Sequence, residues 1–232
     1  MKHIVSLSGG KDSTAMLLMM LEKNMQVDEI FFCDTGMEFP EMYEHLEKLN
    51  SYIKANFNKE ITFLSSEKSF EHYMFHHKRT RGKHINTVGY GWANHLVRWC
   101  TSNLKRDVIR KYLKGKEYIL YIGIAADEPK RHERAELNVR HPLFEWGVTE
   151  RQALSFCYEH GFDWGGYYEH LHRMSCWCCP LQSLNQLRFL YHNRPQLWER
   201  LKDMDAKSYN KFRKDYSVLE LEEKFRKEDE IC

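Results

Sequence analysis

Short apolar runs and longer segments with a helical period alternate along the first part of the chain. The apolar runs, which predict β-strands, stand at residues 3–7, 29–33, 61–64 and 117–124. Segments whose apolar residues recur every three or four positions, which predict α-helices, lie at residues 13–21, 40–53 and 102–113. Strands that alternate with helices form a parallel sheet with helices on its faces. The pattern therefore predicts an α/β fold class with a doubly wound, mostly parallel sheet.

The pattern changes near residue 140 and becomes helical. Thr149, with Gln152 three residues further on, predicts a helix that begins with a capping box. Residues 183–228 have the pattern of two or three helices with dense surface charge. The expected division is an α/β domain at residues 1–140 and a helical, cysteine-containing C-terminal appendage at residues 141–232, packed on it.

The composition is that of a folded protein in a reducing compartment. Of 232 residues, 42% are hydrophobic and 14% aromatic, which excludes the disordered, collagen-like and disulfide-scaffold classes. The longest apolar run, residues 118–126, is shorter than the roughly 20 residues of a membrane span. We expect no membrane segment and no signal peptide. Seven cysteines without a secretory signal favour a cytoplasmic protein.

One stretch of the chain is strongly basic. Residues 78–116 hold eleven Lys and Arg against one acid, Asp107, and include the rings of Tyr90, Trp92 and Trp99. The basic residues that we single out with these rings are Lys78, Arg79, Arg81, Lys83, His84 and Arg98. Cations neutralise phosphates and rings stack on bases, so a polyanion such as tRNA or DNA is one predicted partner. The alternative is a solvated loop that flanks a smaller anionic ligand.

A glycine loop joins the first predicted strand to the first predicted helix. Its sequence is Ser8-Gly9-Gly10-Lys11-Asp12-Ser13, and Ser6 precedes it on the strand. Two glycines let backbone N–H groups approach an anion, and the helix N-terminus adds partial positive charge. Ser8, Lys11 and Ser13 supply side-chain donors. The loop lacks the residue spacing of the kinase P-loop, and it predicts a phosphate cradle of another type.

A second loop follows the predicted strand at residues 29–33. Asp34-Thr35-Gly36 offers a carboxylate to an adenine amino group or a ribose, and Gly36 permits the turn. Its alternative is a plain connecting loop.

Charged residues follow the predicted strand at residues 117–124. Asp127 and Glu128 are hard oxygen ligands suited to Mg²⁺ against phosphates, or else they cap a turn. Arg131 and Arg134 are suited to clamping phosphate or sulfate, and their alternative is solvated surface charge.

The cysteines suggest a metal centre. Cys176 and Cys179 form a Cys-x-x-Cys pair, and Cys100 and Cys157 lie upstream. Four thiolates would bind zinc or an iron-sulfur cluster, since both select sulfur ligands. The alternatives are buried free thiols, or Cys178 as a ligand in place of Cys179 or Cys157.

Four motifs together resemble the PAPS (phosphoadenylylsulfate) reductase-like proteins of the N-type ATP pyrophosphatase superfamily. The motifs are residues 8–13, 34–41, 98–105 and 123–128, with Arg131 and Arg134 beyond, and they span roughly residues 3–140. The resemblance implies that ATP or PAPS lies over the carboxyl ends of the strands, with Gly123 among its contacts. It also makes Lys11, Asp12 and Asp127 the candidate catalytic residues. Relatives with Cys-x-x-Cys-Pro near this position often carry an iron-sulfur cluster, which favours iron-sulfur over zinc.

Three functions follow from these observations. The first is an ATP pyrophosphatase-type enzyme that activates a substrate oxygen and couples this to sulfur transfer. The second is a sulfonucleotide reductase that produces sulfite with electrons from thioredoxin. Thioredoxin-dependent enzymes end in a Glu-Cys-Gly-Leu-His segment, whereas Cys232 here follows Asp-Glu-Ile, so we prefer the first. The third is a metal-stapled nucleotide- or nucleic-acid-binding module in a modification or defence complex.

Overall fold

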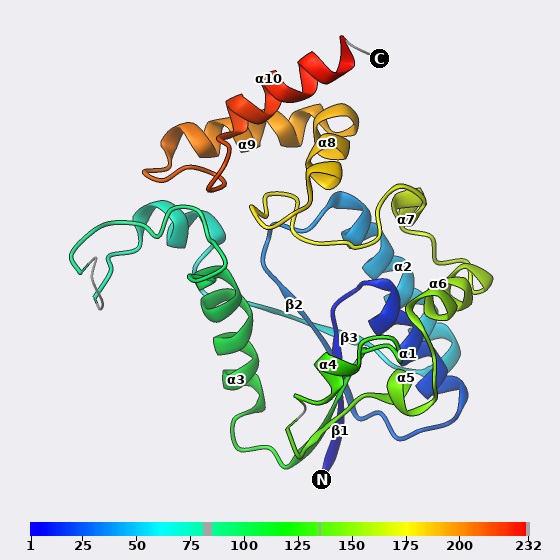
Figure 1. Ribbon diagram of the computed structural model, residues 1–232. Helices are drawn as coiled ribbons and strands as arrows, with labels where there is room; N and C mark the ends of the chain where they lie inside the picture. The colour runs from blue at the N-terminus through cyan, green and yellow to red at the C-terminus, as the bar shows by residue number, and fades with distance from the viewer. Residues whose placement is uncertain (81–84, 135, 231–232) are drawn as a thin grey trace. The chain divides into compact units, whose positions relative to one another are not determined.

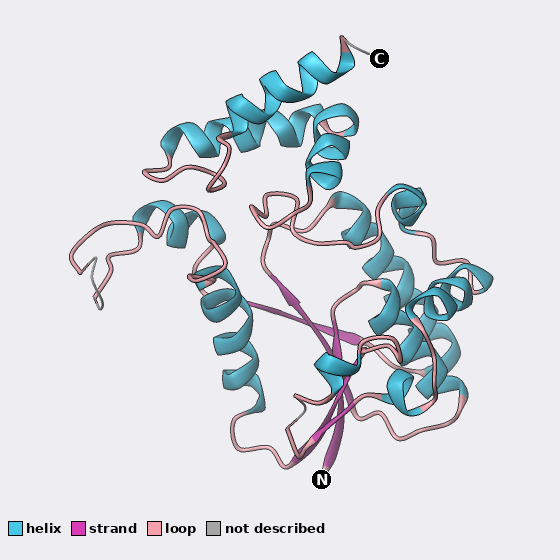
Figure 2. Cartoon of the chain, in the orientation of Figure 1, coloured by secondary structure: helices cyan, strands magenta, loops and turns pink. Residues whose placement is uncertain are grey.

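The computed structural model describes residues 1–80, 85–134 and 136–230. These residues form two compact units, each built from several segments of the chain. The sheet unit comprises residues 1–34, 39–65 and 108–174, and the helical unit comprises residues 35–38, 66–107 and 175–232. Strands occur in the first unit, and helices and loops make up the second (Figure 2).

The sheet unit contains one parallel sheet, so the predicted α/β fold class is confirmed. Within the described residues the strand order is β3-β2-β1-β4-β5, and every neighbouring pair is parallel (Figure 1). The strands are β1 (Lys2–Leu7), β2 (Glu29–Asp34), β3 (Ile61–Ser65), β4 (Tyr118–Ile122) and β5 (Val139–Arg140). Val5 of β1 aligns with Ile30 on one side and Tyr121 on the other, which places the central strand among apolar neighbours. The sequence pattern had not indicated the two-residue strand β5.

Helices connect the strands and complete the hydrophobic core of the sheet unit. The main ones are α1 (Lys11–Glu22), α2 (Pro40–Phe57), α3 (Asp107–Leu113) and α6 (Glu150–Glu159), with short turns at α4 (Pro129–His132), α5 (Pro142–Glu145), η3 (Trp164–Gly166) and α7 (Tyr167–His170). Leu17 of α1 and Leu46 of α2 are fully buried, as the helical period predicts. The capping box of Thr149 and Gln152 is present at the start of α6, which packs on α1.

The helical unit packs around buried aromatic and leucine side chains. Its elements are the π-helical turns η1 (His72–His76) and η2 (Thr101–Arg106) and the helices α8 (Leu184–Asn193), α9 (Pro195–Lys207) and α10 (Val218–Asp229). Trp198 of α9 is 2% exposed, packs on Phe225 of α10, and donates its indole N–H to Glu222 at 2.7 Å. The helical pattern of residues 183–228 thus corresponds to helices with one apolar face.

The compact units divide the chain differently from the boundary expected near residue 140. Residues 141–174 belong to the sheet unit, because α6 packs on α1 and His141 is buried at 2% exposure. Residues 66–107 belong to the helical unit. No helix in the described ranges combines the length and apolar character needed to span a membrane.

Candidate active site

The glycine loop lies between β1 and α1, at the carboxyl end of the central strand. Gly9 has a φ of +77°, and a Cβ there would approach the sulfur of Met42 to 2.3 Å, so a side chain would strain the backbone and displace the Met42 thioether. Gly10 is the N-cap of α1, and its carbonyl accepts from Thr14 N–H at 3.0 Å. The loop therefore presents the first N–H groups of a twelve-residue helix at the sheet edge.

The two serines of the loop are bonded to each other. The Ser8 and Ser13 hydroxyls lie 2.9 Å apart, and the Ser13 oxygen also accepts from Ser8 N–H at 3.1 Å. Ser13 also donates to the carbonyl of Gly10 at 3.1 Å. These bonds fix the loop, so Ser13 acts mainly on its shape.

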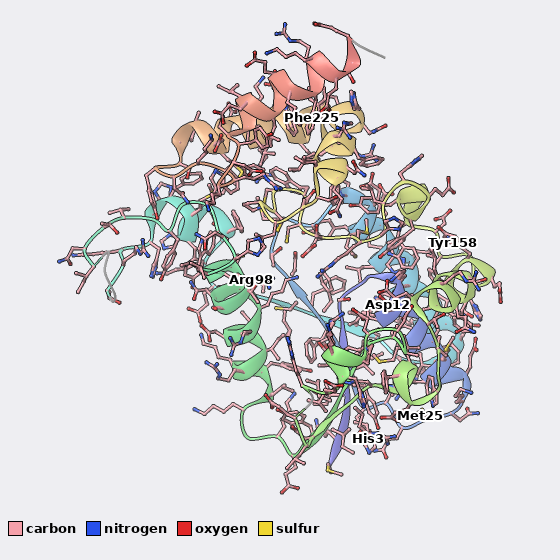
Figure 3. The ribbon with its side chains drawn as sticks, in the orientation of Figure 1. His3, Asp12, Met25, Arg98, Tyr158 and Phe225 are labelled. Atoms are coloured by element: carbon pink, nitrogen blue, oxygen red, sulfur yellow. The ribbon has the colours of Figure 1, made fainter. Side chains whose placement is uncertain are left out.

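Lys11 lies at the centre of a compact charge cluster. Its side chain is 9% exposed, and its Nζ lies 2.9 Å from Asp12 Oδ2 and 2.5 Å from Glu150 Oε2. Burial lowers the pKa of Lys11, but the bonds to Glu150 and Asp12 outweigh it and raise the pKa above its usual value. Burial raises the pKa of the Asp12 carboxyl, and Lys11 partly offsets this effect. Asp12 stands on the first turn of α1 (Figure 3).

Two aromatic residues from the segment after α6 reach the same loop. The Lys11 N–H donates to the Tyr168 hydroxyl at 3.1 Å, and the Trp164 indole N–H donates to the Gly9 carbonyl at 2.8 Å. Sequence reasoning missed Glu150, Trp164 and Tyr168 as site residues, because the Trp164-Gly165-Gly166 pattern indicates only a loop. No sequence motif links these positions to residues 8–13.

Gly123 follows β4 and lies directly against the start of α1. A Cβ on Gly123 would lie 2.7 Å from both the nitrogen and the Cα of Ser13. Only glycine therefore permits this approach of β4 to α1. In the sheet, β1 has β2 on one side and β4 on the other, so the strand order changes direction at β1. Doubly wound sheets in general bind ligands at the carboxyl ends of the strands at such a switch point. Ser6 is half-buried on β1, next to Ile122 of β4.

The other predicted ligands of the sheet unit have protein partners. Asp127 accepts from the N–H of Glu150 at 3.0 Å, which satisfies the start of α6. Arg131 donates through its Nη1 to both carboxylate oxygens of Glu128, at 2.6 and 2.8 Å. Arg134 is exposed, and Asp34 accepts from Tyr43 at 2.8 Å.

Thr35 and Gly36 belong to the helical unit, where Thr35 lies beside a cysteine. Glu38, 7% exposed, accepts from Thr35 at 3.1 Å, from Lys105 Nζ at 3.2 Å and from the Cys176 thiol at 3.6 Å. Gly36 has a φ of +72° and forms the turn, as its sequence context predicts. Glu38 and Lys105 stand in the quoted motifs, but sequence reasoning gave neither a role.

Several cysteines belong to the helical unit. Burial raises the pKa of the Cys178 thiol well above its usual value, and negative charge on Cys176, Cys179 and Cys100 adds to this effect. Burial, followed by the charge of Glu38, likewise raises the pKa of Cys176. Across the described residues, no group of three or more His, Cys, Asp and Glu side chains is arranged to hold a single metal ion.

Cys157 belongs to the sheet unit. Its thiol is fully buried on α6 and donates to the Lys11 carbonyl at 3.4 Å, and burial raises its pKa. It therefore supports the glycine loop.

The Cys-x-x-Cys segment is a turn whose backbone is held from outside. Cys179 N–H donates to the Cys176 carbonyl at 3.1 Å. The buried Gln182 amide donates to the carbonyls of Cys176 and Trp177 at 2.6 and 3.0 Å, and Arg213 donates to the Gln182 carbonyl at 2.6 Å. Gln182 and Arg213 carry no sequence signal of this role.

The basic stretch is less open to bases than its sequence predicts. Trp92 and Trp99 are 2% and 4% exposed, with their indole N–H groups bonded to Asp205 and to the Gly91 carbonyl. Lys78 and Arg98 are exposed, and the predicted contacts Arg81, Lys83 and His84 lie outside the described residues (Figure 3). This stretch therefore exposes cations such as Lys78 and Arg98, but the rings of Trp92 and Trp99 are not open to stacking.

The parallel sheet, with its glycine loop at the carboxyl end of the central strand, defines a doubly wound α/β protein. More particularly, the chain belongs to the phosphoadenosine phosphosulfate reductase domain family, which matches residues 2–181.

Similar proteins occur in an archaeon and a phage. An uncharacterized protein of Methanocaldococcus jannaschii is 24% identical over 219 residues, covering 85% of this chain and 40% of that protein. A second protein of this archaeon is 26% identical over 193 residues, covering 75% of this chain and 40% of that protein. An uncharacterized 37.8 kDa protein of Escherichia phage 186 is 25% identical over 252 residues, covering 86% of this chain and 75% of that protein. The chain thus spans less than half the length of the two archaeal relatives.

Among solved structures, one similar chain is the U34-tRNA thiolase NcsA from Methanococcus maripaludis with its 4Fe-4S cluster. The TM-score is 0.45 and the identity 15%, over 97% of this chain and 72% of that chain. Similarity at this level identifies no function.

Proposed function

We propose that the chain is an adenine-nucleotide-dependent enzyme that activates a substrate oxygen by adenylylation in the service of sulfur transfer. The substrate oxygen attacks the α-phosphorus of ATP, the bond from that phosphorus to the bridging oxygen breaks, and pyrophosphate leaves. Sulfide then attacks the activated carbon, the bond between that carbon and the adenylylated oxygen breaks, and AMP leaves with the oxygen. The observation that carries the proposal is the glycine loop at the end of β1, with the buried cation of Lys11 at its centre.

The loop residues have roles that follow from their positions. Lys11 supplies a fixed positive charge in a buried site, where it stabilises the charge that develops on the departing pyrophosphate. The backbone N–H groups of the first turn of α1 supply further donors. Asp12 and Asp127 offer oxygen ligands, and Mg²⁺ bound there would neutralise phosphate charge.

The cysteines of the helical unit support an iron-sulfur cluster held by Cys100, Cys176 and Cys179. Their sulfur donors suit iron, and the protons of buried thiols such as Cys176 leave when metal binds. Such a cluster, when bound, supplies iron that can hold sulfur. We leave Cys157 out of the ligand set because its thiol already bonds to the Lys11 carbonyl.

Turnover of ATP tests the proposal. Anaerobically purified protein with ATP and Mg²⁺ should bind the nucleotide and release AMP and pyrophosphate, with water as the acceptor. Lys11→Ala should lower this rate by about 100-fold or more, because a preorganised charge at the leaving group is lost. Lys23→Ala, at the exposed C-cap of the same helix, is the matched control and should retain the rate. An unchanged rate in Lys11→Ala would remove the loop from the reaction.

A second candidate is a sulfonucleotide reductase, which the description of the family favours. PAPS and reduced thioredoxin would then yield sulfite, with loss of activity in Cys100→Ser. Sulfite production without pyrophosphate release from ATP would replace our proposal by this one. Nucleotide binding with neither product would favour a binding module.

A further inference from the structure

The backbone N–H and the side-chain ammonium of Lys11 each bond to a protein group that is distant in sequence, and the ammonium also bonds to its neighbour Asp12. The backbone N–H donates to the hydroxyl of Tyr168, 157 residues away, at 3.1 Å. The Nζ donates to the carboxylate of Glu150, 139 residues away, at 2.5 Å. Both partners belong to the sheet unit, as does the loop. Both donor groups of Lys11 are therefore already occupied.

The occupying groups imitate the ligand chemically. An oxygen acceptor on the first N–H of a helix, as at Tyr168, takes the place that an anionic oxygen takes in such sites. A carboxylate on a buried ammonium, as at Glu150, matches the charge-assisted bond of a phosphate oxygen. A phosphate cannot use either donor while these groups remain in place.

We propose that Glu150 and Tyr168 are displaceable occupants of the phosphate loop, so that a nucleotide binds by exchanging its phosphate oxygens for theirs. This inference rests on the proposed function and adds two residues that set the affinity of the same site. A ligand with two or three linked phosphates can replace both occupants at once, whereas a monophosphate offers fewer oxygens. The loop should therefore select polyphosphate nucleotides over AMP.

Glu150 can leave without disturbing its helix. The start of α6 is held independently of that side chain, by the Thr149 capping box and by the bond from Glu150 N–H to Asp127. The Glu150 side chain is 42% exposed, so its carboxylate can turn into water rather than into the core. Lys11 meanwhile keeps Asp12 as a counter-ion.

Tyr168 lies just after a turn that consists of one anchored residue, Trp164, and two glycines. Trp164, Gly165 and Gly166 have consecutive left-handed φ values of 51°, 60° and 79°, and Trp164 is not a glycine, so the turn is strained. Trp164 itself is anchored, because it is 2% exposed, bonds to Gly9 and stacks on His45 at 4.3 Å. Tyr167, the next residue after the glycine pair, is also 2% exposed, so the pair permits only small backbone changes, which suffice to move the Tyr168 hydroxyl off the Lys11 N–H.

Ligand affinities of single and double variants test the exchange. We would measure binding of ATP, inorganic pyrophosphate and AMP by calorimetry in EDTA, so that Mg²⁺ cannot contribute through Glu150. Tyr168→Phe removes one occupant, and Glu150→Gln removes the negative charge that holds the other on Lys11; each should tighten ATP and pyrophosphate binding about three- to tenfold, the worth of one net hydrogen bond. AMP binding should tighten less. Tyr158→Phe and Glu159→Gln, on the surface of α6, are the matched controls and should leave affinity unchanged (Figure 3).

The possible outcomes separate this inference from the proposed function. If wild type binds ATP and neither variant binds it more tightly, the exchange is wrong and the nucleotide site stands. Weaker binding in Tyr168→Phe would mean that its hydroxyl contacts the ligand, which also overturns the exchange. If neither wild type nor the Tyr168→Phe/Glu150→Gln double variant binds ATP or pyrophosphate, both proposals fail. Binding by the double variant alone would support the exchange strongly.

Discussion

The glycine loop, residues 8–13, and the Cys-x-x-Cys segment, residues 176–179, here called the cysteine turn, are stabilised by different kinds of contact. The loop is one contiguous stretch, and its shape follows from local bonds such as that between Ser8 and Ser13, 2.9 Å apart. The cysteine turn also bonds locally, but the thiol of Cys176 donates to a carboxylate from far upstream, that of Glu38, at 3.6 Å. The loop has its own local bonds, to which Trp164 and Cys157 add support from outside, whereas the placement of the Cys176 thiol depends on folding of the whole helical unit.

The largest expected effect tests whether the cysteine turn depends on metal. Cys176→Ser or Cys179→Ser should abolish iron loading and destabilise the helical unit, because binding free energy of the metal is also folding free energy. Cys157→Ser is the matched control, since a serine hydroxyl can still donate to the Lys11 carbonyl. Iron content and the visible spectrum of anaerobic protein measure the effect. Equal iron in Cys176→Ser and wild type, or loss of iron in Cys157→Ser, would contradict the three-cysteine ligand set.

Sequence patterns were more informative about the glycine loop than about the residues that surround it and the cysteine turn. Periodicity gave the parallel fold, and the glycine loop with its flanking strand and helix was readable because all of its parts are adjacent. Glu150 and Tyr168 were not readable, since only tertiary folding brings α6 and the following segment to Lys11. Cys157 has the residue type of a ligand, but burial and its bond to Lys11 decide its place. The compact units divide the chain differently from the expected boundary near residue 140, because α6 packs on α1.

The second prediction tests whether the loop is as rigid as its local bonds suggest. Gly123→Ala would place a Cβ 2.7 Å from the Ser13 nitrogen, which belongs to the backbone and cannot turn aside. We expect a loss of about 1 to 3 kcal/mol in unfolding free energy and weaker ATP binding, as for other overpacked sites. Denaturant unfolding and calorimetry measure the two effects.

The matched control is Gly161→Ala, which meets no atom within 4 Å but has a φ of +78°. It should cost only the strain of a left-handed residue, about 1 kcal/mol, and should leave ATP affinity unchanged. If Gly123→Ala binds ATP as wild type does, α1 can shift without loss, and the rigid description of the loop is wrong.

The smallest expected effect is the loss of stability of the sheet unit in acid, which we attribute to its buried histidine His45. His45 of the sheet unit is 4% exposed, lies 3.0 Å from the Thr14 hydroxyl and stacks on Trp164. Burial, helped by the charge of Lys48, lowers the pKa of His45 to about 3. In the unfolded chain its pKa returns to about 6.5. Between about pH 3 and about pH 6.5, His45 binds a proton in the unfolded chain but stays neutral in the folded protein, so acid favours unfolding.

The stability of the sheet unit should therefore be intact above pH 6.5 and should fall as the pH drops from about 6.5 toward 3, by at most about 1.4 kcal/mol per pH unit from this group. His45→Gln removes the proton site while keeping a polar group near Thr14, so its unfolding free energy should fall less between pH 7.5 and 5 than that of wild type, by about 2 kcal/mol. The offset of the variant at pH 7.5 is subtracted first, and His95→Gln, an exposed site in the helical unit, serves as the control. Identical pH slopes for wild type and His45→Gln would show that His45 becomes protonated in the folded protein, and that its contacts with Thr14 and Trp164 yield to acid before the unit unfolds.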